Sequence, residues 1–110
     1  MLFRSFAGVC PFHGDCLEGL CSNKSIAARA NTDVHGVADL PDDYEYNGTN
    51  IWDLIAYYLA QMCANLTYVV APHHIVLGGG VMQRDGLIDK VRVFSMGILM
   101  YHIMCMVCSV

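Results

Sequence analysis

The clearest pattern of hydrophobic positions begins near Asn50 and continues for about sixteen residues. Apolar side chains recur there at steps of three and four, the spacing that places them on one face of an α-helix. They are Ile51, Leu54, Ile55, Tyr58, Leu59, Met62, Cys63 and Leu66. Asn50 or Thr49 can cap the helix, Asp53 suits its positive N-terminal end, and Pro72 closes it. We therefore predict a long helix that starts beside Asn50 and ends before Pro72.

A second apolar pattern lies upstream and predicts a helix running towards Arg29. Asp15 is suited to the N-cap position, and Glu18 follows three residues later, close to a capping-box arrangement. The apolar positions of this stretch are Leu17, Leu20, Cys21 and Ile26. Residues 31–46 show no sustained period and carry a cluster of acids, so we expect a solvated connector there.

A short run rich in β-branched residues, His74–Leu77, stops at three consecutive glycines, Gly78, Gly79 and Gly80. Residues 81–92 then predict a turn followed by a short helix built on Leu87, Ile88 and Val91. Helix, strand, glycine loop and helix in that order indicate an α/β layered architecture.

Composition and charge narrow the class of protein. The apolar fraction is 55% and the charged fraction only 15%, so a 110-residue monomer has little charge with which to cover its core. This composition indicates a missing packing partner or an atypical segment. The net charge of −4 argues against a nucleic-acid partner, because no basic patch is present to neutralise phosphates. No signal peptide is apparent and Cys63 falls inside a helical pattern, so a reduced, cytoplasmic protein is expected rather than a disulfide scaffold.

The last part of the chain, residues 93–110, contains no Asp, Glu, Lys or Arg and is rich in Met and Cys. Its length reaches the lower limit for a membrane-spanning helix, so a membrane tether is one alternative. His102 and Gly97, together with the lack of a basic flank, argue against that alternative.

The motif most suggestive of chemistry is Cys10-Pro-Phe-His13-Gly-Asp-Cys16. Two thiolates and an imidazole on a tight loop suit a tetrahedral zinc site, which in its structural form needs four such ligands. The alternative is a cysteine pair with an incidental histidine. The strand that ends at Gly78–Gly80 could let backbone approach a nucleotide, or could simply turn tightly. Glu18 could accept hydrogen bonds from ligand hydroxyls, or could only complement the helix dipole.

Residues 6–20 resemble the zinc loop of fructokinase-like members of the ROK family of sugar kinases. Their sequence is Phe-Ala-Gly-Val-Cys-Pro-Phe-His-Gly-Asp-Cys-Leu-Glu-Gly-Leu. Further matching motifs follow in the family's order, so that the resemblance covers about residues 6–92. They are Ala27-Ala-Arg29, Asp39-Leu-Pro-Asp42, Trp52-Asp-Leu54, Tyr57-Tyr-Leu-Ala-Gln61 and Ile75-Val-Leu-Gly-Gly-Gly-Val-Met82.

The resemblance implies an actin-like, ribonuclease-H-like kinase fold, of which residues 1–92 would be part of the C-terminal lobe. It implies transfer of a phosphoryl group from ATP, with magnesium, to a hexose, fructose being favoured, in a protein that can form a homodimer. Cys10, His13 and Cys16 match three of the family's four ligands to a structural zinc, the fourth being an upstream histidine. Glu18 matches a sugar-binding glutamate, and Gly78–Gly80 match the loop against the adenosine of ATP.

The departures from the family pattern are equally informative. The Asp-x-Gly-Gly-Thr phosphate loop and the aspartate that acts as the catalytic base are absent from the printed residues. We therefore expect no catalytic residue in this chain, a C-terminal fragment that is inactive alone, and an out-of-frame or foreign tail at residues 93–110. Ser22-Asn23-Lys24-Ser25 replaces the family's helix-breaking Ser-Gly-Pro-Ala. A non-catalytic zinc-binding or sugar-sensing module is a further alternative.

Overall fold

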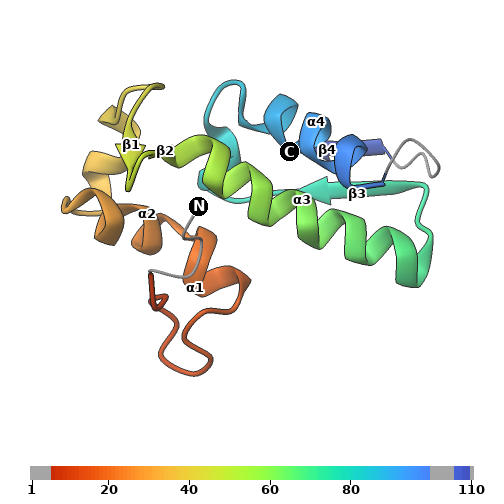
Figure 1. Cartoon of the computed structure of the whole chain (residues 1–110), viewed down its shortest axis with the longest axis horizontal. Coiled ribbons are helices and arrows are strands. Elements are labelled where there is room, and N and C mark those ends of the chain that lie inside the picture. Colours follow the sequence, from red (N-terminus) through yellow and green to blue (C-terminus); the bar gives the residue numbers. More distant parts are fainter. Residues whose placement is uncertain (1–5, 100–105, 110) are drawn as a thin grey trace. The chain divides into compact units, whose positions relative to one another are not determined.

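The computed structural model describes residues 6–99 and 106–109, which form helices and short strands in two compact units, Met1–Ile55 and Ala56–Val110 (Figure 1). The mixture of helices and strands agrees with the predicted α/β class. The elements in chain order are α1 (Leu17–Cys21), α2 (Asn23–Ala30), the 3₁₀ helix η1 (His35–Asp39), β1 (Glu45–Tyr46), β2 (Thr49–Asn50), α3 (Ile51–Val70), β3 (His74–Leu77), the 3₁₀ helix η2 (Val81–Gln83), α4 (Leu87–Leu99) and β4 (Met106–Ser109).

The helix predicted to run towards Arg29 is broken at Ser22, where the backbone is extended (φ −69°, ψ 162°). The Ser22 hydroxyl accepts a hydrogen bond from the Ser25 amide at 3.3 Å and so caps the second helix, α2. The break is therefore kept although the family's Gly-Pro pair is absent. The expected N-cap is corrected as well: Cys16, not Asp15, occupies that position of α1, without a side-chain hydrogen bond.

The predicted acidic connector contains two elements that its hydrophobic pattern did not reveal. One is η1, and the other is a hairpin in which Glu45 pairs with Asn50 and Tyr46 pairs with Thr49. Asn47 and Gly48 both have positive φ, 51° and 78°, as a two-residue type I′ turn requires. The Asn-Gly pair is itself the sequence signal for this hairpin.

The long helix α3 confirms the prediction made from residues 50–66. The Asn50 side-chain oxygen accepts hydrogen bonds from the amides of Trp52 at 2.9 Å and Asp53 at 3.2 Å, so Asn50 caps the helix. Its Nδ2 donates to the Asp42 carbonyl at 2.7 Å, which ties the cap to the preceding loop. Beyond the end of α3, Ala71 is in the left-handed region (φ 50°) directly before Pro72.

The second unit contains a two-stranded parallel sheet in which His74 of β3 pairs with Met106 of β4 and Leu77 pairs with Ser109. Along β3 exposed and buried residues alternate, so one face of this strand is covered. The helix α4 lies in the connection between the strands and packs on β4, as parallel pairing requires a long crossover.

The expected end of the last helix at Arg92 is wrong. α4 continues to Leu99, because Val91 and Ser95 remain on one buried side and the Ser95 hydroxyl donates to the Val91 carbonyl at 2.7 Å. Residues 93–99 and 106–109 of the predicted tail therefore belong to α4 and β4, and residues 100–105 and 110 lie outside the described part.

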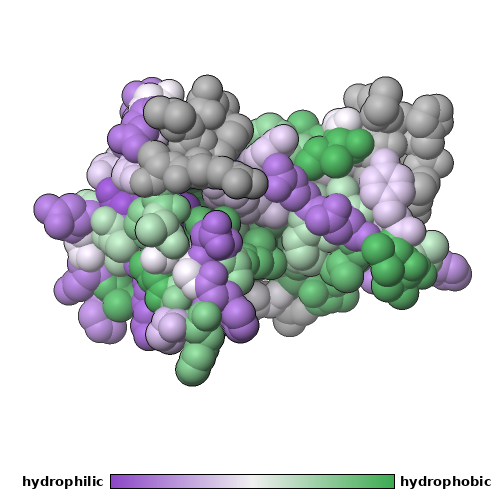
Figure 2. Space-filling model, turned by 60° about the horizontal axis from the view of Figure 1, so that its bottom comes forward, coloured by the Kyte–Doolittle hydropathy of each residue, from purple (hydrophilic) through white to green (hydrophobic). Residues whose placement is uncertain are grey.

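Several large hydrophobic side chains are exposed, and apolar groups stand among polar ones on the surface (Figure 2). They are Phe12, Leu17, Val34, Leu66, Tyr68, Val69, Val70, Val76, Val93 and Met96. Within residues 6–99 and 106–109, every helix is too short or too polar to cross a bilayer.

Replacing Asn50 by Ala tests the cap of α3. The substitution removes both amide contacts, and the free energy of unfolding is expected to fall by about 1 kcal/mol. Asn65→Ala is the matched control, because Asn65 is exposed on α3 and Ala is the better helix former. Urea unfolding followed by circular dichroism measures both. Equal stabilities for the two variants would contradict the assignment of Asn50 as the cap.

Candidate metal centre

The cysteine- and histidine-containing loop is closed by its own backbone. The Cys10 amide donates to the Gly14 carbonyl at 3.3 Å, and the Gly14 amide donates back to the Cys10 carbonyl at 3.0 Å. Three residues, Pro11, Phe12 and His13, are left as the tip. Gly14 has φ +64°, a conformation that glycine adopts without steric cost. The loop is thus a small hairpin that turns the chain sharply before α1.

Three glycines seat this hairpin on α1. The Gly14 carbonyl is packed between the α-carbons of Gly8 and Gly19, where an added Cβ would meet its oxygen at 2.0 Å and 1.9 Å. The Val9 amide also donates to the Gly19 carbonyl at 3.0 Å. No other residue fits at Gly8 or Gly19 without moving the backbone. The sequence reading missed these glycines, although their positions on either side of the Cys10–Cys16 loop were a usable signal.

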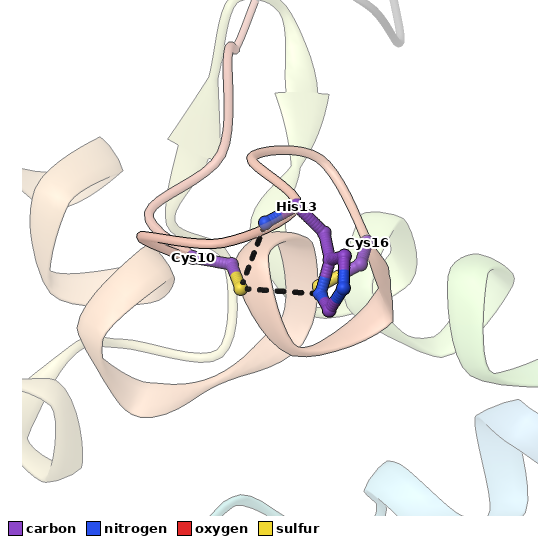
Figure 3. A group of neighbouring side chains, drawn as sticks. All are labelled: Cys10, His13 and Cys16. Atoms are coloured by element: carbon purple, nitrogen blue, oxygen red, sulfur yellow. Dashed lines mark hydrogen bonds between the residues drawn. The ribbon is translucent and has the colours of Figure 1, made fainter.

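The seated loop brings together the three predicted metal ligands (Figure 3). The ligand atoms of Cys10, His13 and Cys16 all lie within 4.8 Å of one another. Cys10 Sγ accepts a hydrogen bond from the His13 amide at 3.4 Å and lies 3.8 Å from His13 Nδ1. His13 is exposed and both cysteines are half-buried, so the cluster lies at the surface of its unit.

The loop changes the acidity of one thiol. Hydrogen bonds from the backbone of His13, and next from that of Phe12, lower the pKa of Cys10 from 9.0 to about 7. Burial opposes this shift, and the side chains of Cys16 and His13 add smaller lowering contributions. The lowered pKa favours the thiolate form of Cys10 near neutral pH. The thiolate is the form that binds a metal.

The pKa of Cys21, the last residue of α1, is shifted in the opposite direction. Burial raises the pKa of Cys21 to about 12, and the positive charge of Arg29 lowers it only partly. This thiol is 6% exposed and stays protonated at physiological pH. Among the cysteines whose side chains are described, Cys10 and Cys16 of the loop are the accessible pair, whereas Cys21 and Cys63 are buried.

The donor set of the loop fits zinc. Soft thiolates with an imidazole are typical zinc ligands, and zinc holds them at about 2.0–2.3 Å. Atoms bound to one such ion lie roughly 3–4 Å apart, so the observed cluster, with its atoms within 4.8 Å, needs only small side-chain movements. Cys10, His13 and Cys16 would supply three of the four ligands of a tetrahedral site.

A buried arginine of α2 contacts both α1 and the segment that precedes the Cys10–Cys16 loop. Arg29 is 7% exposed, and one of its terminal nitrogens donates to the Leu20 carbonyl at 2.6 Å. Its guanidinium lies 4.2 Å from the centre of the Phe6 ring, where the loop segment begins, and 5.9 Å from the centre of the Tyr46 ring. The Ser25 hydroxyl donates to the same Leu20 carbonyl at 2.7 Å. The sequence reading gave Arg29 no role.

Glu18 lies on the first turn of α1, two residues after Cys16, and its side chain is exposed. Its backbone carbonyl accepts from the Ser22 amide at 3.1 Å, so the residue is fixed where α1 ends. The position leaves the carboxylate open to a ligand close to the Cys10–Cys16 loop. Its role in sugar binding stays a prediction.

Gly78, Gly79 and Gly80 belong to the second unit and form the turn between β3 and η2. Gly79 has φ +104°, and a Cβ added at Gly78 or Gly79 would meet no atom within 4 Å. The Gly79 and Gly80 carbonyls accept from the amides of Met82 and Gln83, each at 3.2 Å. The turn is exposed and bare of side chains, a surface that another molecule can approach closely. Nucleotide binding there stays a prediction.

Comparison with known proteins assigns the chain to a family. The chain matches the ROK family over residues 1–108, and so it belongs to that family. It is 43% identical over 88 residues to a fructokinase of Lactococcus lactis subsp. cremoris, covering 80% of this chain and 28% of that protein. It is 41% identical over 89 residues to a fructokinase of Streptococcus mutans serotype c, covering 81% and 28%. A putative fructokinase of Bacillus subtilis is 40% identical over 79 residues, covering 72% and 24%.

Family membership implies the actin-like sugar kinase fold, of which the described residues form an α/β portion. The chain spans about a quarter of the length of these curated relatives: 28%, 28% and 24%. The family match also runs past Arg92 to residue 108, so it does not itself mark the boundary expected there. A tail unrelated to the family stays a prediction.

The substitution Gly19→Ala tests the packing of the loop against α1. Its methyl group would occupy the place of the Gly14 carbonyl, so the hairpin must leave α1. We expect a loss of about 1–3 kcal/mol in the free energy of unfolding and a zinc content well below one per chain. Gly97→Ala in α4 is the control, because a Cβ there meets nothing within 4 Å and should leave zinc content unchanged. Full zinc binding by Gly19→Ala would contradict the packing account.

Proposed function

We propose that this chain contributes the zinc loop and the nucleotide-facing glycine turn of an ATP- and magnesium-dependent kinase that phosphorylates a hexose, with fructose as the preferred substrate. Membership of the ROK family and identities of 37–43% to proteins named fructokinases or putative fructokinases support the proposal. The observation that carries it is the convergence of Cys10, His13 and Cys16 directly before Glu18. The membrane-tether and sugar-sensor alternatives receive no support from the described residues.

In this proposal the zinc is structural. Cys10, His13 and Cys16 hold it, and the bound ion fixes the start of α1 because Cys16 occupies the N-cap of that helix. Glu18 then presents its carboxylate from the first turn and accepts hydrogen bonds from the hydroxyls of the hexose. Hydrogen bonds to a charged acceptor are about twice as strong as neutral ones, and they suit a polyhydroxylated ligand. No group among these residues performs proton transfer.

The glycine turn has a different role in the proposal. Gly78–Gly80 present bare backbone at the end of β3, and the adenosine of ATP lies against it. Ligands of α/β proteins commonly bind at the carboxyl ends of strands, which is where this turn is found. Transfer of the γ-phosphoryl group further needs a base and a phosphate-binding loop. Neither the Asp-x-Gly-Gly-Thr motif nor an assigned base is among the 110 residues, so we propose that this polypeptide alone is inactive.

The test is a chimaera in which residues 6–92 replace the matching segment of the Lactococcus lactis fructokinase. It should phosphorylate fructose with ATP. Glu18→Gln in the chimaera should lower kcat/KM roughly 10- to 100-fold, the effect of losing hydrogen bonds to a charged group. Glu45→Gln is the matched control, since Glu45 is an exposed carboxylate of the β1–β2 hairpin in the same unit.

Two results would contradict the proposal. One is undiminished kcat/KM in the Glu18→Gln chimaera, which would remove the sugar-binding role. The other is fructose phosphorylation by the isolated 110-residue chain above a matched blank, which would mean that the printed residues contain a base that we have not assigned.

A further inference from the structure

The cysteines whose side chains are described fall into two groups. Cys21 and Cys63 are buried, at 6% and 1% exposure. Cys10 and Cys16 are half-buried, carry no disulfide, and flank the exposed His13 on one short loop. Oxidants in solution reach accessible thiols far more readily than buried ones, so among these four cysteines oxidation is expected to begin at the loop pair.

The two loop sulfurs are also close enough to react with each other. They lie within 4.8 Å, and a disulfide would bring them to about 2.05 Å. That movement is of the size that side-chain rotation and a small shift of the loop tip provide. The tip, Pro11–His13, is exposed, and the Cys10–Gly14 backbone pair and the hydrogen bond from the His13 amide to Cys10 Sγ close it. The closed ring would be short, so little chain entropy opposes its formation.

We propose that Cys10 and Cys16 form a reversible thiol–disulfide couple that releases the zinc when the loop meets a peroxide. The inference rests on the proposed zinc site, which it extends from structure to regulation. One thiolate attacks the peroxide oxygen, giving a sulfenic acid and hydroxide. The second thiolate attacks the sulfenic sulfur, the S–S bond forms, and a second hydroxide leaves. The two sulfurs lose two electrons, the peroxide gains them, and two protons convert the hydroxides to water.

Release of the metal follows from the ligand count. A disulfide sulfur carries no negative charge and is a poor zinc ligand, because zinc binds the thiolate form. After oxidation His13 would be the single remaining ligand of the loop, and one imidazole does not hold a structural zinc. A thiol reductant restores both thiolates, so zinc can return. The couple is thus a switch between a metal-bound and a disulfide-closed loop.

Formation of the Cys10–Cys16 disulfide would also affect helix α1. Cys16 is the N-cap of that helix, and Glu18 stands two residues further on. Drawing the Cys16 sulfur towards Cys10 changes the start of α1 and with it the position of the Glu18 carboxylate. Oxidation would therefore weaken hexose binding without touching the carboxylate itself.

The experiment uses the 110-residue chain loaded with zinc and titrated with hydrogen peroxide. A chromogenic chelator follows zinc release, and peptide mapping by mass spectrometry locates the oxidised residues. We expect one zinc released for each Cys10–Cys16 disulfide, a mass loss of two hydrogens, and recovery of zinc binding after reduction. Cys21→Ser is the control variant, and it should release zinc at the same peroxide concentration, because Cys21 is buried and outside the loop.

Three results would overturn the inference. The zinc could stay bound at peroxide concentrations that oxidise a small free thiol. It could leave only with irreversible sulfinic or sulfonic acids on single cysteines. Mapping could also find the disulfide at other cysteines. If the chain binds no zinc at all, the proposed metal site fails, and the metal-free chain still tests the couple. A Cys10–Cys16 disulfide formed and reversed there would support it, and its absence would reject it.

Discussion

The candidate site depends on one close backbone contact, the Gly14 carbonyl packed between the α-carbons of Gly8 and Gly19. Any side chain at Gly8 or Gly19 would occupy the space of that oxygen. The contact places the hairpin directly on α1, so that Cys16 can serve both as the last loop residue and as the helix N-cap. The three side chains converge because the backbone is fixed at both ends of the loop.

The surroundings of this loop separate two kinds of cysteine within one short segment. Backbone amides facing Cys10 stabilise its thiolate, whereas burial keeps Cys21 protonated. Below them, Arg29 joins the Leu20 carbonyl to the Phe6 ring and so connects the end of α1 with the start of the loop segment. Such a buried cation is costly to desolvate and is kept only where hydrogen bonds and ring contacts compensate. Contacts from Arg29 of α2 therefore stabilise the site together with the packing of its own glycines.

What could be predicted from the sequence was largely local. The face of α3, its Asn50 cap and the strand His74–Leu77 follow from periodicity and from single-residue preferences. The spacing of Cys10, His13 and Cys16 indicated a zinc loop, and the structure brings those ligands together. The role of Arg29 was missed because it depends on contacts between segments. The break at Ser22 was missed although the cap that fixes it, between the Ser22 hydroxyl and the Ser25 amide, is local. The extent of α4 was misjudged because the uncharged residues after Arg92 were interpreted as a tail, whereas Ser95 continues the buried side of the helix.

The roles given to Glu18 and Gly78–Gly80 come from family resemblance. Their exposure is compatible with binding, but it does not itself select a sugar or a nucleotide. The candidate metal site is different, since the donor atoms that could hold an ion are already clustered. The zinc K-edge X-ray absorption spectrum of the zinc-loaded chain tests the proposed metal site most directly. We expect two sulfur neighbours at about 2.3 Å and a nitrogen neighbour at about 2.0–2.1 Å. A spectrum with nitrogen and oxygen neighbours alone would contradict it.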